Sequence, residues 1–310
     1  MEQQVRRLVT RSDFDGLACA MMLKELQLID EIKFVHPKDV QDGKIELSKN
    51  DITTNLPYDP RVSLAFDHHE SEVDRLKAIE TGGKLIIDPK ARSAARVVYD
   101  YYGGKEAFPR ISEDLMAAVD KGDSADFTMD EILDPKGWVL LHYLMDARTG
   151  LGRFHHFRIS NYDLMMQLID YCLDHDIDEI LELPDVKERV ELYFEQAEQF
   201  KAQLRRIARV HDKVVVLDLR KEEVIHAGNR FMIYALYPET EISVHVAWGF
   251  RKQNTAVMIG KSIVNKASQV DIGELCLQYG GGGHRNAGTC QMDNDVVDEK
   301  LPDIIRALNG

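Results

Sequence analysis

The chain has 310 residues, and its 53 Asp and Glu residues outnumber its 39 Lys and Arg residues, which gives a formal net charge of −14. With 44% hydrophobic and 30% charged residues, it is too apolar for a disordered protein and long enough for two domains. The acidic balance excludes a protein that grips long nucleic acid through clustered Lys and Arg. A small phosphorylated substrate remains compatible, because bound metal ions can supply positive charge locally.

Cellular location is indicated by the cysteines and by the absence of targeting signals. No stretch approaches the roughly 18 apolar residues of a membrane span, and the N-terminus has no signal-peptide pattern. No two of the four cysteines form a C-x-x-C pair, so reduced and mostly buried thiols are expected. We therefore expect a cytoplasmic protein that does not bind membranes.

The first 125 residues alternate between strand and helix patterns. Short apolar strands are expected at 5–10, 32–36, 52–55, 62–66 and 85–88, and helices at 17–28 and 93–102. Such alternation predicts a parallel sheet covered on both faces. In these sheets, polar residues just past the carboxyl ends of the strands gather in one crevice.

The second half of the chain changes character twice. Residues 111–183 are predicted to be mostly helical, and residues 186–210 form an amphipathic helix pattern without Gly or Pro. Strands are then expected at 214–219, 231–236, 242–248 and 256–261, and a helix at 272–279. We expect an α/β protein with an N-terminal parallel-sheet domain at 1–185, a linker helix at 186–212 and a smaller mixed-sheet α/β domain at 213–310.

Three acidic clusters lie where predicted strands or helices end: Asp13 with Asp15, Asp67 with His68 and His69, and Asp120 with Asp123. Carboxylates with imidazole and no thiolate suit Mn²⁺ or Mg²⁺ better than structural zinc. Two such ions about 3.5–4 Å apart can clamp a phosphoryl group. Ordinary turn chemistry explains any one cluster alone, but three at the same edge of a sheet favour a metal site.

A run of four glycines, 280–283, precedes His284, Arg285 and Asn286. Glycine N–H groups can approach an anion closely, as in nest-like phosphate sites. The run follows a helix and lacks the Lys of a P-loop, so it is not one. A helix C-cap would explain a single glycine, whereas four followed by His and Arg favour a ligand-binding loop.

Other polar segments are weaker candidates for substrate binding. Residues 153–158 mix aromatic rings with cations that include Arg158, as a single-strand site would, although a surface turn explains them equally well. Residues that could line the same cleft in the second domain are Asn229, Arg230, Arg251, Lys261 and Ser262. The stretch 226–231 is expected to start a helix.

Together, Asp67-His68-His69, the upstream Asp13-x-Asp15 and the glycine run ending in His284 resemble the DHH phosphoesterase superfamily with its associated C-terminal domain. The resemblance covers both halves of the chain. It implies a two-domain, usually Mn²⁺-dependent phosphohydrolase. Members include RecJ-type nucleases, nanoRNases, dinucleotide phosphodiesterases, pyrophosphatases and exopolyphosphatases.

The resemblance also implies roles for individual residues. It makes Asp13, Asp15, His68 and Asp123 metal ligands, with Asp67 and His69 supporting or contacting the site and His284 touching the substrate phosphate. The expected catalytic residues are Asp67, His68, His69 and His284. The expected substrate-binding residues are Arg11, Gly281, Gly282, Gly283, His284, Arg285, Asn286, Arg158 and Arg251.

Two positions depart from the pattern of the superfamily. Arg11 stands where a His usually opens the first motif, and Asn55 is the nearest match to a further Asp ligand. These changes weaken one metal position, while Arg11 can place a fixed positive charge near the phosphate. One ion, two ions and a catalytically inactive site all stay open.

We therefore expect a phosphodiesterase that uses Mn²⁺, or Mg²⁺ or Co²⁺, to hydrolyse short oligonucleotides or linear dinucleotides such as pGpG to mononucleotides. Long duplex DNA is not an expected partner, and a homodimer is a further option. The alternatives are a pyrophosphatase or exopolyphosphatase, which would need no base-stacking surface, and a catalytically degenerate nucleotide-binding protein.

Overall fold

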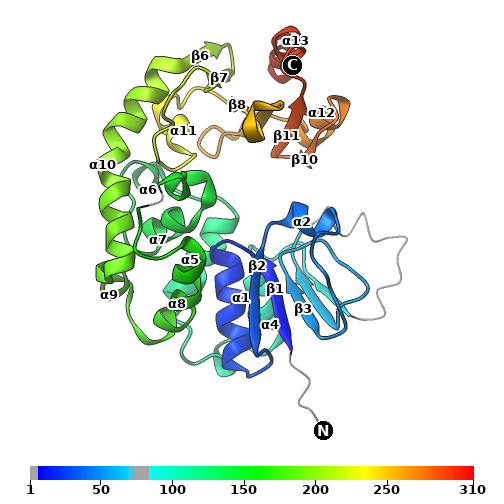
Figure 1. Cartoon of the computed structure of the whole chain (residues 1–310), viewed down its shortest axis with the longest axis vertical. Coiled ribbons are helices and arrows are strands. Elements are labelled where there is room, and N and C mark those ends of the chain that lie inside the picture. Colours follow the sequence, from blue (N-terminus) through cyan, green and yellow to red (C-terminus); the bar gives the residue numbers. More distant parts are fainter. Residues whose placement is uncertain (1–5, 70–71, 73–83, 155) are drawn as a thin grey trace. The chain divides into compact units, whose positions relative to one another are not determined.

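The structure, a computed structural model, describes residues 6–69, 72, 84–154 and 156–310. Its chain divides into two compact units (Figure 1). Unit 1 comprises Met1–Asp126, Lys136–Ala147 and Gly152–Glu191, and unit 2 comprises Phe127–Pro135, Arg148–Leu151 and Leu192–Gly310. No helix in the described ranges is long and apolar enough to cross a membrane.

Unit 1 is built on a five-stranded sheet of order β2-β1-β3-β4-β5 in which every neighbouring pair is parallel. Its strands are β1 (Arg7–Arg11), β2 (Glu31–Val35), β3 (Asp51–Thr54), β4 (Leu64–Asp67) and β5 (Leu85–Ile87). The predicted parallel sheet is confirmed. Because β1, β3 and β4 are adjacent, the segments that follow them meet at one edge of the sheet.

Helices surround this sheet. The helices of unit 1 are α1 (Phe14–Glu25), α2 (Pro37–Gln41), α4 (Ala94–Tyr101), α5 (Glu113–Asp123), α7 (Gly137–Met145), α8 (Asn161–Asp174), α9 (Ile177–Glu182) and the first part of α10 (Pro184–Ile207). Every residue of α1 from Phe14 to Leu23 is buried, and α1 contacts α4, α5 and α8. This burial on all sides explains why α1 is rich in Ala, Met and Leu and has no polar face.

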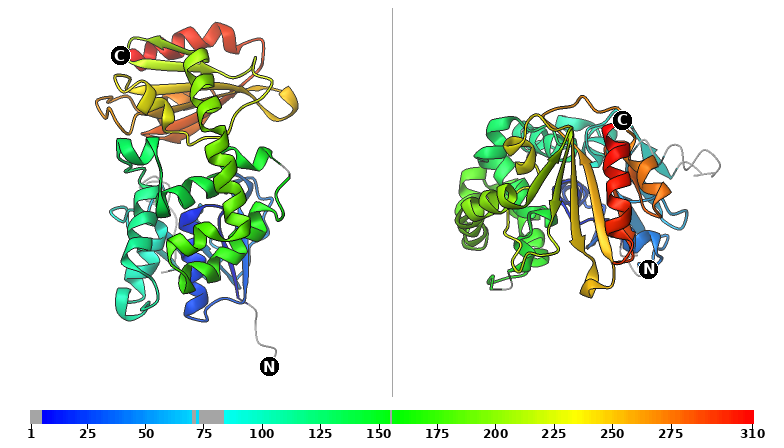
Figure 2. Two further views of the ribbon diagram at one scale, coloured as in Figure 1. Left: turned by 90° about the vertical axis from the view of Figure 1, so that its left-hand side faces the viewer. Right: turned by 90° about the horizontal axis from the view of Figure 1, so that it is seen from above.

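Unit 2 contains a six-stranded mixed sheet of order β10-β11-β9-β8-β7-β6, with only β7 and β8 parallel among its neighbouring pairs. Its strands are β6 (Ala208–His211), β7 (Val214–Asp218), β8 (Ile242–Trp248), β9 (Thr255–Lys261), β10 (Gly282–His284) and β11 (Ala287–Met292). Its helices, besides the end of α10, are α6 (Met129–Leu133), α11 (Met232–Leu236), α12 (Ile272–Gln278) and α13 (Val297–Asn309). The core formed by Val244, Ile259 and Ile304 joins the sheet to α12 and α13, drawn in orange and red in Figure 2.

One predicted element of unit 2 is wrong, and the linker helix is present but shorter than expected. The expected strand at 231–236 is instead α11, which follows a turn in which the Asn229 side-chain oxygen accepts the N–H of Phe231 at 3.1 Å. The Tyr234 hydroxyl then donates to the carbonyl of Gly260 at 2.9 Å, so contacts with the sheet fix this short helix. The linker helix ends at Ile207, and the residues that follow it form β6.

Candidate active site

The turn between β1 and α1 is closed by Asp13, the N-cap of α1. Its Oδ1 accepts the N–H of Gly16 at 3.0 Å, and its Oδ2 lies 2.7 Å from Nε of Arg11. A side chain at Gly16 would overlap the carbonyl oxygen of Arg11, which explains why glycine is needed here. Protein groups therefore already bind both oxygens of Asp13.

Asp15 lies two residues further, inside the first turn of α1, and is only 3% exposed. Its carboxylate accepts three N–H groups, from the Asn55 side chain at 2.8 Å and from the amides of Ala94 and Ala95 at 3.1 and 2.7 Å. Burial, with the nearby charge of Asp123, raises the pKa of Asp15 well above its usual value. A bound cation relieves this kind of crowding.

Asn55 follows β3 and is buried in a left-handed conformation, with φ of 54°. Asn tolerates this region better than most residues, which suits it to the sharp end of the strand. Its amide nitrogen donates to Asp15, while its Oδ1 is buried with no hydrogen-bond partner among the described residues. The structure thus gives Asn55 a positioning contact with Asp15.

The Asp-His-His sequence begins at Asp67, the last residue of β4, which is 2% exposed. Its Oδ1 accepts the backbone N–H of His68 at 2.9 Å and lies 2.7 Å from Nδ1 of His69. Its Oδ2 is buried and has no hydrogen-bond partner within the described ranges. An unpartnered buried carboxylate oxygen is costly, and a metal ion would stabilise it.

His68 connects this strand end to α5. Its Nδ1 lies 3.3 Å from the carbonyl oxygen of Ala91, and its Nε2 lies 2.8 Å from Oδ2 of Asp123, the last residue of α5. Burial opposes protonation, but the contact with Asp123 outweighs it and raises the pKa of His68 to about 9. The same contact lowers the pKa of Asp123 in spite of its burial. In the metal-free state the two side chains therefore form an ion pair.

Among the described residues there are two groups of three potential ligand atoms that lie within 4.8 Å of one another: Asp15 with His68 and Asp123, and Asp67 with His68 and His69. Buried carboxylate oxygens with imidazole fit a hard or borderline divalent ion. The structure thus brings three of the four expected ligands together, and places the fourth, Asp13, close enough to act on the charge of Asp15. Asp120 belongs to neither group, because Arg96 at 2.6 Å and the Ser93 hydroxyl at 2.7 Å bind its carboxylate.

Sequence reasoning missed the backbone groups of the site. These are the amides of Ala94 and Ala95, which bind Asp15, and the carbonyl of Ala91, which contacts His68. Side-chain patterns do not reveal backbone contacts. The one available signal was Ser93, the N-cap of α4, because a helix start can bind an anion.

The glycine run of unit 2 is partly strand. The segment Gly282–His284 forms β10, paired with β11, so the expected open loop is confined to its ends. A side chain at Gly281 would overlap the carbonyl of Thr289, which shows that close backbone packing requires glycine there. The run therefore serves strand packing as well as any ligand.

Polar side chains gather where β10 turns into β11. His284, Arg285 and Asn286 are exposed there, and the N–H of Lys261 donates to the Asn286 carbonyl at 2.9 Å. Burial, with the charge of Arg285, lowers the pKa of Lys261. Two cations thus lie near each other beside His284, an arrangement suited to an anion.

Two further expected substrate-binding residues, Arg158 and Arg251, have contacts of their own. In unit 1, Nε of Arg158 is 3.5 Å from Oδ1 of Asp185. In unit 2, Arg251 follows β8 at the end of the β8–β9 hairpin opposite Lys261, where it lies over the ring of Phe250. The structure does not bring Arg251 together with the turn that carries His284.

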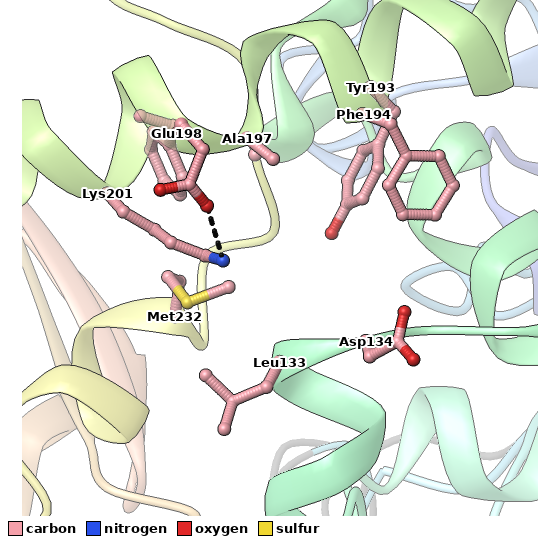
Figure 3. A pocket seen from close by; sticks show the side chains of 10 residues that line it. Leu133, Asp134, Tyr193, Phe194, Ala197, Glu198, Lys201 and Met232 are labelled. Carbon is pink, nitrogen blue, oxygen red and sulfur yellow. Dashed lines mark hydrogen bonds and ion pairs between the residues drawn. The ribbon is translucent and has the colours of Figure 1, made fainter.

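A pocket of about 250 Å³ lies within unit 2 (Figure 3). The Glu198–Lys201 ion pair, at 3.0 Å, forms part of its wall. The pocket is lined by Leu133, Asp134, Tyr193, Phe194, Ala197, Glu198, Phe200, Lys201, Gly228 and Met232. It contains none of the expected site residues.

Solved structures show what this chain is similar to. A pGpG-specific phosphodiesterase from Vibrio cholerae is 56% identical, with a TM-score of 0.83 over 98% of this chain and 99% of that one. An exopolyphosphatase-related protein from Bacteroides fragilis is 12% identical, with a TM-score of 0.53 over 98% and 92%. RecJ from Thermus thermophilus, solved with Mn²⁺, is 15% identical, with a TM-score of 0.52 over 98% and 52%. The last two show the fold alone.

Neither protein-family models nor curated proteins give a match. The relationship rests on the near-complete coverage at 56% identity and on the Asp-His-His strand end, which the structure places in a buried group suited to a metal. The chain therefore belongs to the DHH phosphoesterase superfamily, a group of phosphoric-ester hydrolases.

Proposed function

We propose that this protein is a Mn²⁺-dependent phosphodiesterase that hydrolyses linear dinucleotides, pGpG among them, to mononucleotides. The observation that carries the proposal is the convergence of Asp15, His68 and Asp123 in a chain that is 56% identical to a pGpG-specific phosphodiesterase. The four free, buried cysteines support a place in the reducing cytoplasm.

In the proposed reaction, Asp15, His68 and Asp123 would hold a divalent ion. Such an ion supplies Lewis acidity and lowers the pKa of bound water. Asp67 and His69 flank these ligands, and the 2.7 Å contact between Asp67 and Nδ1 of His69 orients the ring. Arg11 contributes a positive charge that can stabilise a phosphate oxygen as negative charge develops on it.

Residues of unit 2 are proposed to bind the rest of the substrate. His284, Arg285 and Lys261 present cationic or hydrogen-bonding groups at the β10–β11 turn, which suits a phosphate. A dinucleotide has few phosphates, so a few such groups suffice. The net charge of −14 repels a long polyanion from the rest of the surface, so a short substrate is favoured.

The proposal is tested by incubating the protein and Mn²⁺ with pGpG, pApA, a seven-nucleotide RNA and inorganic pyrophosphate in parallel. Separation of the products by ion-exchange chromatography should show GMP from pGpG, with much slower loss of the RNA and of pyrophosphate. Turnover of pyrophosphate without turnover of dinucleotides would replace the proposal with the pyrophosphatase alternative. Tight binding of pGpG without turnover under Mn²⁺, Mg²⁺ or Co²⁺ would indicate a nucleotide sensor.

A further inference from the structure

We propose that the Arg11 guanidinium is a built-in second cation of the metal centre, so that the centre binds one divalent ion per chain. This inference deepens the proposed function and rests on it, because it concerns the same site.

Both carboxylate oxygens of Asp13 contact protein groups. Its Oδ1 accepts the N–H of Gly16 at 3.0 Å, and its Oδ2 lies 2.7 Å from Nε of Arg11. To bind an ion, Asp13 would have to give up the ion pair or share its oxygens with two cations. These two partners lie on either side of the turn between β1 and α1. Asp13 therefore stabilises this turn and neutralises Arg11.

His68 belongs to both groups of potential ligands. Its Nδ1 lies 3.3 Å from the Ala91 carbonyl, which can only accept a hydrogen bond, so Nδ1 carries a proton. Only Nε2 is then left for a metal, and an imidazole nitrogen with a single lone pair binds one ion. The two groups therefore cannot each hold an ion through His68.

The carboxylate of Asp15 is also occupied by protein groups. Its oxygens already accept N–H groups from Asn55, Ala94 and Ala95 at 2.8, 3.1 and 2.7 Å. Three donors reduce the lone pairs that remain for metals. The side chain at 55 is an amide that donates here, not a carboxylate that could add a ligand and a negative charge.

Arg11 carries a fixed positive charge, because a guanidinium stays protonated in proteins, and its Nε lies 2.7 Å from Oδ2 of Asp13. Four carboxylates, Asp13, Asp15, Asp67 and Asp123, are then balanced to within one charge by Arg11 and a single divalent ion. A second divalent ion would lie close to a fixed cation in a buried site, where repulsion is strong.

The test is the metal stoichiometry of the full-length protein. Metal-free protein is titrated with Mn²⁺ by calorimetry, the bound metal is counted by elemental analysis after desalting, and the electron paramagnetic resonance spectrum is recorded. We expect one Mn²⁺ per chain and the six-line spectrum of an isolated ion. Two Mn²⁺ per chain with an exchange-coupled spectrum would overturn the inference.

Arg11→His supplies the matched test, because it removes the fixed charge, releases Oδ2 of Asp13 and offers an imidazole. We expect two Mn²⁺ per chain in this variant. The control is Arg7→His at the other end of β1, where Arg7 forms a 2.7 Å ion pair with Asp51, and it should keep one ion. An Arg11→His protein that folds by circular dichroism and still binds one ion would show that Arg11 does not hold the second position.

If Arg11→His does not fold, Arg11→Met gives a second measurement. It removes the charge and keeps an unbranched, mostly apolar side chain, so Mn²⁺ should bind at least several-fold more tightly than in the wild type. Unchanged affinity would overturn the role of Arg11. Hydrolysis of pGpG by a protein that binds two ions would leave the proposed function intact, whereas one bound ion without turnover would leave the inference intact and remove the function.

Discussion

Nε2 of His68 lies 2.8 Å from Oδ2 of Asp123, so a short contact joins the residue that follows β4 to the last residue of α5. Both side chains are proposed ligands, and in the metal-free state each neutralises the other. The contact holds together two side chains that could both be ligands of a divalent ion, and binding of such an ion would require loss of the proton that the pair shares.

Substitution of His68 should separate catalysis from folding. We expect His68→Ala to lower the rate of pGpG hydrolysis by at least about 10²-fold, the scale for loss of one preorganised electrostatic group. Mn²⁺ affinity should fall as well, while the circular dichroism spectrum stays unchanged. His175→Ala is a control, because His175 is exposed and its Nδ1 contacts the carboxylate of Glu179 at 3.2 Å. Retained activity in His68→Ala would remove it from the ligand set.

Removal of metal should lower the stability of unit 1. Binding of Mn²⁺ to the folded state alone stabilises it by about 2.7 kcal/mol at 100 times the dissociation constant. We therefore expect Mn²⁺ to raise the melting temperature of EDTA-treated protein in a concentration-dependent way. Asp123→Asn should lose most of this increase, and an equal increase in that variant would contradict the assignment of Asp123.

Asn55 should act on the metal through Asp15. Asn55→Gly keeps the left-handed backbone at φ of 54° but removes the amide that donates to Asp15. Loss of such a supporting contact typically lowers metal affinity by about 10–100-fold, and we expect that range here. Calorimetric titration with Mn²⁺ provides the measurement. Asn265→Gly is a control, since Asn265 donates to the Glu239 carbonyl on an exposed part of unit 2.

Two neighbouring glycines should respond differently to the same substitution. A side chain at Gly281 would overlap the Thr289 carbonyl, whereas the position of a side chain at Gly282 is open. We expect Gly281→Ala to lower the free energy of unfolding by about 1–3 kcal/mol, the cost of overpacking, and Gly282→Ala to leave it nearly unchanged. Urea unfolding of both variants measures this. Equal loss in both would indicate that strand packing at β10 does not depend on Gly281.

Asn229 should stabilise unit 2 through buried hydrogen bonds. Its amide nitrogen donates to the Ile132 carbonyl at 2.9 Å and to the Tyr193 hydroxyl at 3.0 Å, and Asn229 is fully buried. Asn229→Ala leaves the carbonyl without this partner, which costs about 1–3 kcal/mol. A lowered melting temperature at saturating Mn²⁺, with unaltered metal stoichiometry, is the expected result. A metal-binding defect would instead show that Asn229 influences the site.

The fold of unit 1 could be predicted because its signals are redundant. The strand ending at Asp67 and the turn at Asp13 each carry both an apolar strand pattern and a polar cluster, and adjacent parallel strands bring such ends together. The superfamily and the parallel sheet, predicted from those residues, are confirmed. Asp120 was grouped with Asp123 by its spacing, which does not reveal that Arg96 and Ser93 bind its carboxylate.

Two features of unit 2, the helix α11 and the strand β10, could not be predicted from sequence patterns. Residues 231–236 are a short apolar run, and a run of this length has the same pattern in a buried strand and in a buried helix. The turn at Asn229 and the bond from the Tyr234 hydroxyl decide between them, and both depend on residues distant in the chain. The glycine run was expected to be an open loop, because pairing with β11 leaves no trace in four identical residues.

The three N–H groups that donate to Asp15 also restrict the length of the segment that connects β5 to α4. Two of them open α4, and only the segment from Asp88 to Ser93 separates that helix from the end of β5. An insertion or deletion there would shift the register of the helix start against the sheet and so displace a side chain about 80 positions earlier in the sequence. Apart from Ser93, the buried N-cap of α4, this connecting segment should therefore tolerate changes of residue but not of length, although it contains none of the expected metal ligands.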